Sequence, residues 1–317
     1  MEIEEPVQKS PRQAPGALAR FLDSDLWWSF KRSPLVIVAA LVTVTMILAS
    51  VFAPLVAPYD PFDLASIDLL DSLKPPAWIE GGSTKYLLGT DDQGRDVFST
   101  ILYGSRISLL VGFLSVVMAL VIGIFVGLVA GYAGGWVDAV LMRIADVQLS
   151  FPAILIALLI DGVVRGLLPQ GRHEDLALIV LIIAIGLSFW VQYARTVRGS
   201  TLVERTKEYV QAAQVTGLPD GLILVRHILP NVMGPVLVIA TIQLALAVII
   251  EATLSFLGVG VPPTSPSLGT LIRIGNDYLF SGEWWITVFP GLALIVLVLA
   301  VNLLGDWLRD ALNPKLR

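Results

Sequence analysis

Five long stretches without a charged residue constrain this 317-residue chain more than any other feature. They are 34–59, 107–137, 176–194, 227–250 and 284–305. Apolar runs of about 18 residues or more are typical of helices that cross a bilayer. Only 15% of the residues are charged, whereas soluble domains carry about 25%. The sequence therefore predicts an all-α integral membrane protein.

A sixth span is harder to recognise because its uncharged run, 147–160, is short. Asp138, Arg143 and Asp146 precede this run, and a helix that includes them would be long enough to cross. Arg143 and Asp146 are three residues apart, so they can neutralise each other on one helix face. Pro152 interrupts the span because proline kinks a helix. The kink either marks a gate on a transport path or accommodates packing, which leaves Pro152 a candidate for either role.

The distribution of Lys and Arg orients the six spans. Of the 21 such residues, 13 lie in segments that are cytoplasmic when the N-terminus is inside, 7 lie in the opposite segments, and Arg143 lies within a span. Both termini are therefore expected to be cytoplasmic. The expected division is a cytoplasmic tail at 1–33, a first transmembrane helix at 34–58, an extracytoplasmic loop at 59–105, a transmembrane domain at 106–306 with an inner loop at 195–230, and a cytoplasmic tail at 307–317.

Glycines in the second span recur on one helix face. Gly123, Gly127, Gly131 and Gly135 are each four residues apart, and Gly112 lies eleven residues before Gly123. Small residues at this spacing let a neighbouring helix approach closely in a bilayer. The stripe predicts a helix–helix interface, and either sliding during transport or static packing is compatible with it.

Glu251 stands toward the outer end of the fifth apolar run. A charge in a span costs about 2.5–3.5 kcal/mol at the helix centre and less near the interface. Such a carboxyl belongs either to a substrate or proton path, or to the structure, where it is neutral or paired with Arg273 or a backbone donor. The sequence keeps both alternatives open.

The inner loop between the fourth and fifth spans is predicted to fold as two short helices. The first covers 204–216 and ends at Gly217, which suits the residue after a helix. Pro219 fits the first turn of the second helix, whose apolar residues 222–225 would attach it to the membrane surface. Ala212-Ala213 leaves a shallow patch that suits insertion between ridges of another protein. The alternative is an amphipathic loop that lies on the bilayer.

This loop resembles the EAA loop of ABC-importer permeases, which has Glu-Ala-Ala, three residues, Gly, nine residues and an apolar-x-Leu-Pro end. The matching positions are Ala212, Ala213, Gly217, Leu229 and Pro230. Gln211 replaces the glutamate and His227 replaces the usual aliphatic residue. Because the charge is missing, no ionic role is assigned to Gln211.

Three further segments, 88–96, 254–263 and 302–314, resemble the C-type subunit of the dipeptide/oligopeptide class of these permeases. The resemblance implies a type I ABC-importer permease fold with six transmembrane helices in the bacterial inner membrane. It also implies a second homologous permease, two cytosolic ATPase subunits that bind ATP and Mg, and an extracytoplasmic solute-binding protein. The residues it assigns to ATPase coupling are Gln211, Ala212, Ala213, Gly217, His227, Leu229 and Pro230.

The chain lacks the sequence patterns of nucleotide hydrolysis and of a metal site. No lysine follows a glycine, so the phosphate-binding G-x4-G-K-[ST] pattern is absent. There is no cysteine, and the two histidines, His173 and His227, fall on opposite sides of the membrane. We therefore expect no enzyme activity, no metal site, no cofactor in this chain and no nucleic-acid partner.

Two other functions are less compatible with the sequence. An ion-coupled secondary transporter would show two similar halves and intramembrane carboxylates, but no such repeat is visible and Glu251 is the main candidate carboxylate. An intramembrane hydrolase would need a metal set or a Ser–His arrangement, and neither is present. Peptides are the default solute of the class, and glutathione, nickel chelates, opines and sugars stay open.

Overall fold

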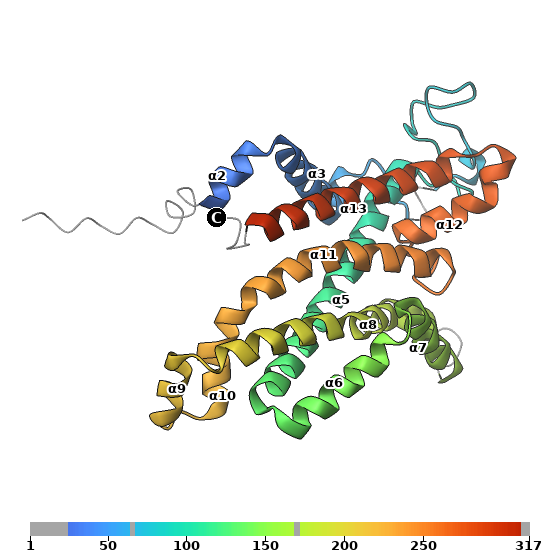
Figure 1. Cartoon of the computed structure of the whole chain (residues 1–317). Coiled ribbons are helices and arrows are strands. Elements are labelled where there is room, and N and C mark those ends of the chain that lie inside the picture. The colour runs from blue at the N-terminus through green and yellow to red at the C-terminus, as the bar shows by residue number, and fades with distance from the viewer. Residues whose placement is uncertain (1–24, 64–66, 168–171, 312–317) are drawn as a thin grey trace, which may run out of the picture.

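The computed structural model describes residues 25–63, 67–167 and 172–311, and its regular elements are helices (Figure 1). In chain order they are α2 (Asp25–Arg32), α3 (Pro34–Val51), α4 (Ala53–Val56), η1 (Leu69–Asp71), α5 (Val97–Ala133), α6 (Gly135–Leu149), α7 (Ala153–Leu167), α8 (Arg172–Glu204), α9 (Glu208–Val215), α10 (Asp220–Ile223), η2 (Leu224–Ile228), α11 (Leu229–Phe256), α12 (Leu268–Tyr278), η3 (Leu279–Ser281) and α13 (Trp285–Ala311).

Five helices of the described chain are long and apolar enough to cross a membrane. They are α3, α5, the 176–204 part of α8, the continuous run from α10 through η2 to α11, and α13. A sixth span results if α6 and α7 are counted as one, although they meet at 90°. The prediction of six spans agrees with the structure when α6 and α7 are counted together as a broken third span.

The break between α6 and α7 lies at the Phe151-Pro152 pair. Proline has no backbone N–H and cannot continue the α6 hydrogen-bond ladder, so the carbonyl of Pro152 instead accepts from the N–H groups of Leu155 and Ile156 in the first turn of α7. The expected pairing of Arg143 with Asp146 is wrong. Asp146 Oδ1 accepts from Arg195 Nη2 of α8 at 2.5 Å instead, because the neighbouring helix brings a second guanidinium within reach.

Helix α5 packs along α8 through its glycines. A methyl group at Gly123 would lie 2.3 Å from Tyr193 Cβ, and one at Gly131 would lie 2.7 Å from Thr201 Cβ. Two predicted members of the stripe lie elsewhere. Gly112 faces Val248 of α11, where a methyl group would come within 2.9 Å of Val248 Cγ2, and Gly135 begins α6 with nothing within 4 Å. The helix turn at Gly134, with φ +66°, ends the stripe one residue before Gly135.

The spans form a bundle in which α5 and α11 hold two sides together. Helices α3 and α13 pack against each other on one side, and α6, α7 and α8 lie on the other (Figure 1). Helix α11 contacts α5, α8 and α13, and α12 packs on α13. One end of the bundle carries α9 and α10, and the loop between α4 and α5 lies near the other end (Figure 1).

Several helix ends differ from the sequence-based division. The first span ends at Val51, and α4 follows after Phe52. Helix α5 already begins at Val97, because Asp96 accepts a hydrogen bond from Ser99 N at 2.8 Å and caps it. Helix α8 continues to Glu204 and α11 begins at Leu229, so both helices extend into the 195–230 segment. Helix α13 continues to Ala311.

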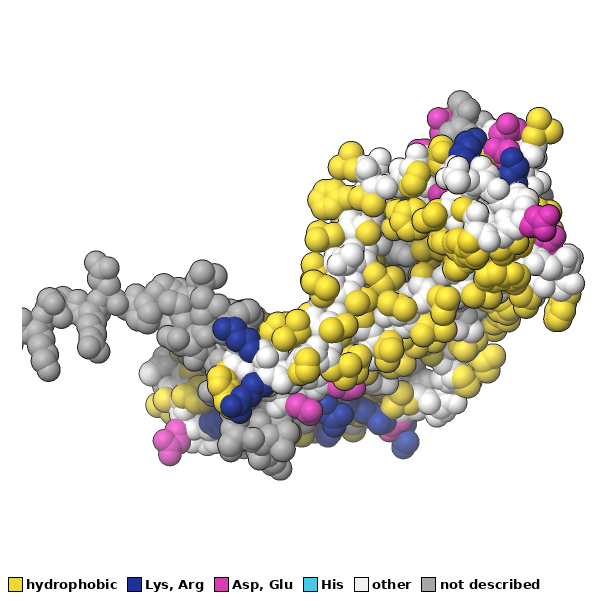
Figure 2. All heavy atoms as spheres, turned by 90° about the horizontal axis from the view of Figure 1, so that it is seen from above, with side chains coloured by type: hydrophobic (Ala, Val, Ile, Leu, Met, Phe, Trp, Pro, Cys, Tyr) yellow, Lys and Arg dark blue, Asp and Glu magenta, His cyan; other side chains and the backbone are white. Residues whose placement is uncertain are grey.

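Apolar side chains cover much of the outside of the bundle. Figure 2 shows them over the middle of one face, with charged side chains gathered at its upper right end and along the lower margin. Leu41 and Phe125 are each 68% exposed, in the middle of α3 and α5. Exposed apolar surface of this extent fits a bilayer rather than water as the surrounding solvent.

Candidate functional site

The segment between α8 and α11 folds into a compact hairpin, which we call the coupling hairpin (residues 205–228). Its first helix, α9, ends at Val215 with Thr216 as the C-cap, and Gly217 follows with φ +76°. Gly217 N donates to Gln214 O at 3.0 Å and Leu218 N to Ala213 O at 3.2 Å. These two bonds are the Schellman arrangement that closes a helix on a left-handed residue, where glycine avoids the Cβ strain of other residues.

One side of the coupling hairpin is buried in the protein. Val210, Ala213, Ile223 and Ile228 belong to the main apolar core, and Ile223 is fully buried. Residue 223 therefore does not attach the hairpin to the membrane surface as the sequence suggested. The turn at Gly217 folds α10 back onto α9, and Ile223 is buried in the core. Leu222 and Val225 remain exposed.

The other side of the hairpin is free of contacts with the described chain's core. Gln211, Ala212 and Val215 are exposed on α9, and Val215 is 89% exposed. Gln211 Nε2 donates to the carbonyl of Thr206 at 3.2 Å, so its amide holds the start of α9. An exposed face of small and apolar side chains on a buried support has the form of a docking surface.

Hydrogen bonds fasten the coupling hairpin to the end of α5. Tyr132 Oη donates to Asp220 Oδ1 at 2.6 Å and accepts from Gln214 Nε2 at 3.2 Å. Arg205 Nη1 donates to the carbonyls of Gly131 and Tyr132 at 3.0 and 3.1 Å, which are otherwise unpaired at the helix end. A polar hollow of about 580 Å³ lies among these residues, lined by Tyr132, Ala133, Arg205, Thr206, Gln211, Gln214 and Asp220.

A second set of bonds joins the hairpin to α8 and α11. Tyr209 Oη donates to Glu204 at the end of α8 and accepts from Asn231 Nδ2 of α11 at 3.1 Å. Asn231 Nδ2 also donates to the carbonyl of His227 at 2.7 Å. Burial and the hydrogen bond to Glu204 raise the pKa of Tyr209 to about 12, so the phenol stays a donor. Pro230 follows in the first turn of α11, directly after η2.

The coupling hairpin is therefore attached to three long helices at once. Sequence reasoning found Gly217 and the two alanines but missed Tyr132, Tyr209, Asp220 and Asn231. Tyr132 and Asp220 are 88 residues apart, and Tyr209 and Asn231 are 22 residues apart, so sequence spacing does not pair them. A polar residue at a helix end is too common a signal to reveal such pairs.

Glu251 is fully buried among hydroxyl groups. Ser108 Oγ of α5 donates to Glu251 Oε2, and Ser255 Oγ donates to Glu251 Oε1, both at 2.7 Å. Ser108 Oγ also accepts from Leu268 N at 3.3 Å, at the start of α12. The alternative of an Arg273 partner is not realised in the described chain: the carboxylate of Glu251 accepts from the two serines, and the Arg273 guanidinium lies against Gly258. Glu251 thus joins α5, α11 and α12, as a structural carboxyl would.

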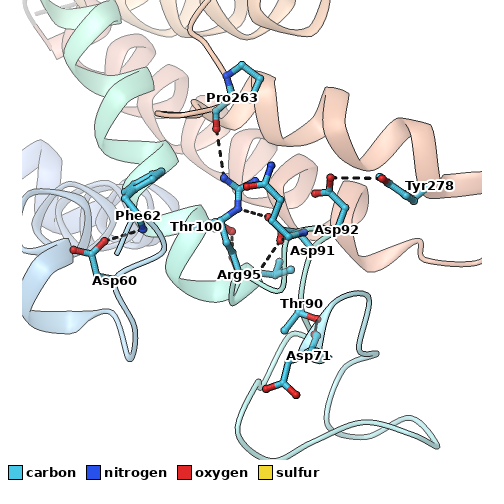
Figure 3. Close-up of polar contacts among 12 residues, drawn as sticks. Asp60, Phe62, Asp71, Thr90, Asp91, Asp92, Arg95, Thr100, Pro263 and Tyr278 are labelled. Carbon is cyan, nitrogen blue, oxygen red and sulfur yellow. Dashed lines mark hydrogen bonds and ion pairs between the residues drawn. The ribbon is translucent and has the colours of Figure 1, made fainter. Parts of the chain in front are cut away.

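The loop between α4 and α5 is closed by a buried ion pair (Figure 3). Arg95 Nε donates to Asp91 Oδ2 at 2.6 Å, and both side chains are 3% exposed. Arg95 Nη1 reaches the carbonyl of Pro263 at 3.4 Å, and Trp285 Nε1 donates to the carbonyl of Thr90 at 3.0 Å. These contacts bind the loop to the α11–α12 connection and to α13. The sequence signature 88–96 is accordingly a folded clasp, which we call the loop clasp.

The loop clasp gives a stability prediction. Replacing Arg95 with methionine leaves Asp91 buried without its partner, which costs about 3–5 kcal/mol. Lys85→Met is the matched control, because Lys85 also pairs with an aspartate but is 46% exposed, and an exposed pair contributes about 0–1 kcal/mol. Limited proteolysis of the detergent-solubilised protein should cut the Arg95→Met loop quickly and the Lys85→Met loop at the wild-type rate. Equal rates for all three would contradict the assignment.

The described residues contain no group of three or more His, Asp or Glu side chains placed to hold a metal ion. The arrangement described above has two parts. It presents a braced hairpin at one end of a membrane bundle and a closed clasp at the loop between α4 and α5.

Comparison with known proteins matches most of the chain. Residues 123–317 match the family model described as binding-protein-dependent transport system inner membrane component, and residues 23–76 match the N-terminal TM domain of oligopeptide transport permease C. The dipeptide transport system permease protein DppC of Escherichia coli is 40% identical over 293 residues, which cover 92% of this chain and 93% of the relative. The di/tripeptide transport system permease protein DppC of Pseudomonas aeruginosa is 38% identical over 311 residues, 98% of each chain.

The fold also has a solved counterpart. A chain from the inward-facing MetNI methionine ABC transporter superposes with a TM-score of 0.52, covering 68% of this chain and 96% of that one. The two are 20% identical in sequence. At that identity the likeness concerns the fold, which is that of an ABC importer permease.

Proposed function

This chain belongs to the family of binding-protein-dependent transport system inner membrane components, and from that premise we propose that it forms half of the path through an ATP-driven importer of short peptides. It is a multi-pass protein of the bacterial inner membrane. Short peptides are the proposed solute because relatives at 36–40% identity over most of the chain are named dipeptide or di/tripeptide permeases.

The observation that carries this proposal is the bracing of the coupling hairpin. Because hydrogen bonds and core contacts attach it to α5, α8 and α11, a partner that displaces the hairpin moves three spanning helices together. The exposed residues Gln211, Ala212 and Val215 offer that partner a surface. We assign them to docking on a cytosolic ATPase subunit, whose ATP-driven closure shifts the permease between two states.

Docking of the coupling hairpin on a cytosolic ATPase also implies an orientation in the membrane and a set of partners. The end with α9 and α10 faces the cytoplasm, both termini are cytoplasmic, and the loop clasp faces the opposite side, where a solute-binding protein delivers its cargo. A second homologous permease completes the path, and two ATPase subunits bind ATP and Mg. This chain contributes no residues for nucleotide chemistry, so hydrolysis belongs to those subunits.

The test is a gentle-detergent purification of the C-terminally tagged chain, followed by reconstitution of what co-purifies. We expect a second permease, ATPase subunits and a solute-binding protein, and ATP-dependent uptake of a labelled dipeptide into proteoliposomes. The control is an ATPase subunit whose phosphate-binding lysine is replaced, which should abolish uptake. Uptake by the isolated chain without ATP, driven by an ion gradient, would overturn the proposal in favour of a secondary transporter.

A further inference from the structure

Helix α6 has two exposed sides of opposite character. Ala139, Arg143, Asp146 and Ser150 recur at the spacing that places residues on one face of a helix, and all four are exposed. The adjacent exposed side, about 100° around the helix, carries Trp136, Val140, Ile144 and Val147. A helix surrounded by lipid would be apolar on both of these sides. The two sides of α6 therefore meet different surroundings.

Helix α8 repeats the same pattern next to it. Ser188, Gln192, Arg195 and Gly199 have the spacing of the α6 set and are half-buried or exposed, while Val191 and Ala194 between them are buried. The bond of 2.5 Å from Arg195 to Asp146 joins the two rows, so they share one side of the bundle. Gln243 Nε2 of α11 donates to Gln192 Oε1 at 2.5 Å and extends that side. We call Arg143, Asp146, Ser150, Ser188, Gln192 and Arg195 the polar face.

The polar face lies within the membrane-spanning part of the bundle. Gln148 Nε2 donates to the carbonyl of Leu187, and Trp190 Nε1 donates to Gln148 Oε1 at 3.1 Å. Leu187 is near the middle of α8, which runs from Arg172 to Glu204. Arg143 precedes Gln148 by five residues, about 7.5 Å along the helix axis. Arg143 therefore lies closer to the middle of the membrane than the end of α8 does.

Arg143 has no ion-pair or hydrogen-bond partner in the described part of the chain. The carboxylate nearest in sequence, Asp146, is bonded to Arg195 instead. A guanidinium at this depth is costly against lipid, and an unpaired charge in a dry protein interface is costly as well. Water or a passing anion removes both costs. The charges of the polar face are two positive and one negative, which favours an anionic group.

From this geometry we infer that the polar face lines the water-filled path of the solute, and that Arg143 contacts the carboxylate of a passing short peptide. The inference rests on the proposed function and adds to it the wall of the path and a residue that meets the solute. A guanidinium presents paired N–H donors that match the two oxygens of a carboxylate. Because Arg143 is exposed, the contact is weak enough to release the solute.

The chain has no cysteine, so a single introduced cysteine reports on its own surroundings. The test compares Arg143→Cys with Val140→Cys, on the apolar side of α6, in the assembled complex in nanodiscs. Charged, membrane-impermeant thiosulfonates should modify residue 143 at least about tenfold faster than residue 140, because apolar surroundings raise the pKa of a thiol and so suppress the reactive thiolate. A dipeptide together with the solute-binding protein and ATP should slow the modification of residue 143.

Uptake gives a second readout that a purely structural role would not move. Arg143→Cys should lower ATP-driven dipeptide uptake about tenfold, and an aminoethyl reagent, which restores a positive charge, should recover a large part of it. A sulfonatoethyl reagent of similar size, which adds a negative charge, should recover none. Recovery by both reagents or by neither would remove the role of Arg143 in contacting a carboxylate.

A second position keeps the inference testable if Arg143→Cys does not assemble. Gln192→Cys, on α8, should also be modified and protected by the solute. If wild-type complex transports dipeptide with ATP but cysteines at 143 and 192 stay unreactive, the polar face is a dry contact with the second permease and this inference fails alone. If the wild-type complex shows no ATP-driven uptake, the proposed function fails first.

Discussion

Replacing Gly127 with leucine should prevent α5 from packing on α8 and leave little correctly folded protein. Even a methyl group at this position would lie 2.6 Å from the carbonyl oxygen of Ala194 and 2.7 Å from Val197 Cβ. The carbonyl oxygen of Ala194 is a backbone atom, so it cannot move aside by a side-chain rotation. Overpacking a tight core costs about 1–3 kcal/mol of folding free energy. Because leucine adds further atoms at a contact with backbone, we expect the cost for this variant at or above the upper end of that range.

The matched control is Gly162→Leu in α7, where an added methyl group would meet nothing within 4 Å. Both changes put the same side chain into a spanning helix. Size-exclusion chromatography after heating in detergent should show a large fall in the midpoint temperature for Gly127→Leu and a small change for Gly162→Leu. A Gly127→Leu protein that is monodisperse and fully active would contradict the close approach of α5 and α8.

Replacing Gly217 with glutamate should abolish ATP-driven uptake and ATPase association while the protein still inserts into the membrane. Gly217 has φ +76°, and a residue with Cβ in that region costs about 1–2 kcal/mol. This strain is too small to unfold a six-span bundle, and no atom lies within 4 Å of an added methyl group. The effect is therefore local, because it loosens the closing turn of α9 and adds a charge to the proposed docking surface.

Two further variants separate strain from charge. Gly217→Asn should retain most of the uptake, since asparagine tolerates the left-handed region, and Gly217→Ala should be intermediate. Co-purification of the ATPase subunit measures docking, and the yield of membrane-inserted protein controls for folding. Wild-type recovery of the ATPase with Gly217→Glu would remove the docking role from the coupling hairpin.

The spans and the coupling hairpin were predictable because their signals are local. An uncharged apolar run such as 107–137 has to leave water, and it exceeds the about 20 residues that a helix needs to cross a bilayer. Gly217 ends α9 because a helix closes most easily on a residue without Cβ. The helix ends were less predictable: α5 begins at Val97 because Asp96 caps it, although Arg106 suggested a later start.

The contacts between distant segments were not predictable in the same way. Arg143 and Asp146 have a spacing that suits an ion pair, but the carboxylate of Asp146 pairs with Arg195 of α8 instead. A residue on a neighbouring helix can therefore replace a partner on the same helix. Glu251 likewise bonds to serines of two helices rather than to Arg273. Which partner wins depends on the distances that packing sets, and sequence spacing does not contain them.

The sequence by itself determined that this chain crosses a membrane several times and carries a hairpin at one end, because hydrophobic burial and helix termination act over a few neighbouring residues. Its resemblance to importer permeases also follows from sequence alone. Only the tertiary structure decided that Tyr132, Tyr209 and Arg205 brace that hairpin, and that α6 and α8 share a polar side. Those features arise from helices brought together from distant parts of the chain, and close packing of their small residues fixes which polar groups meet.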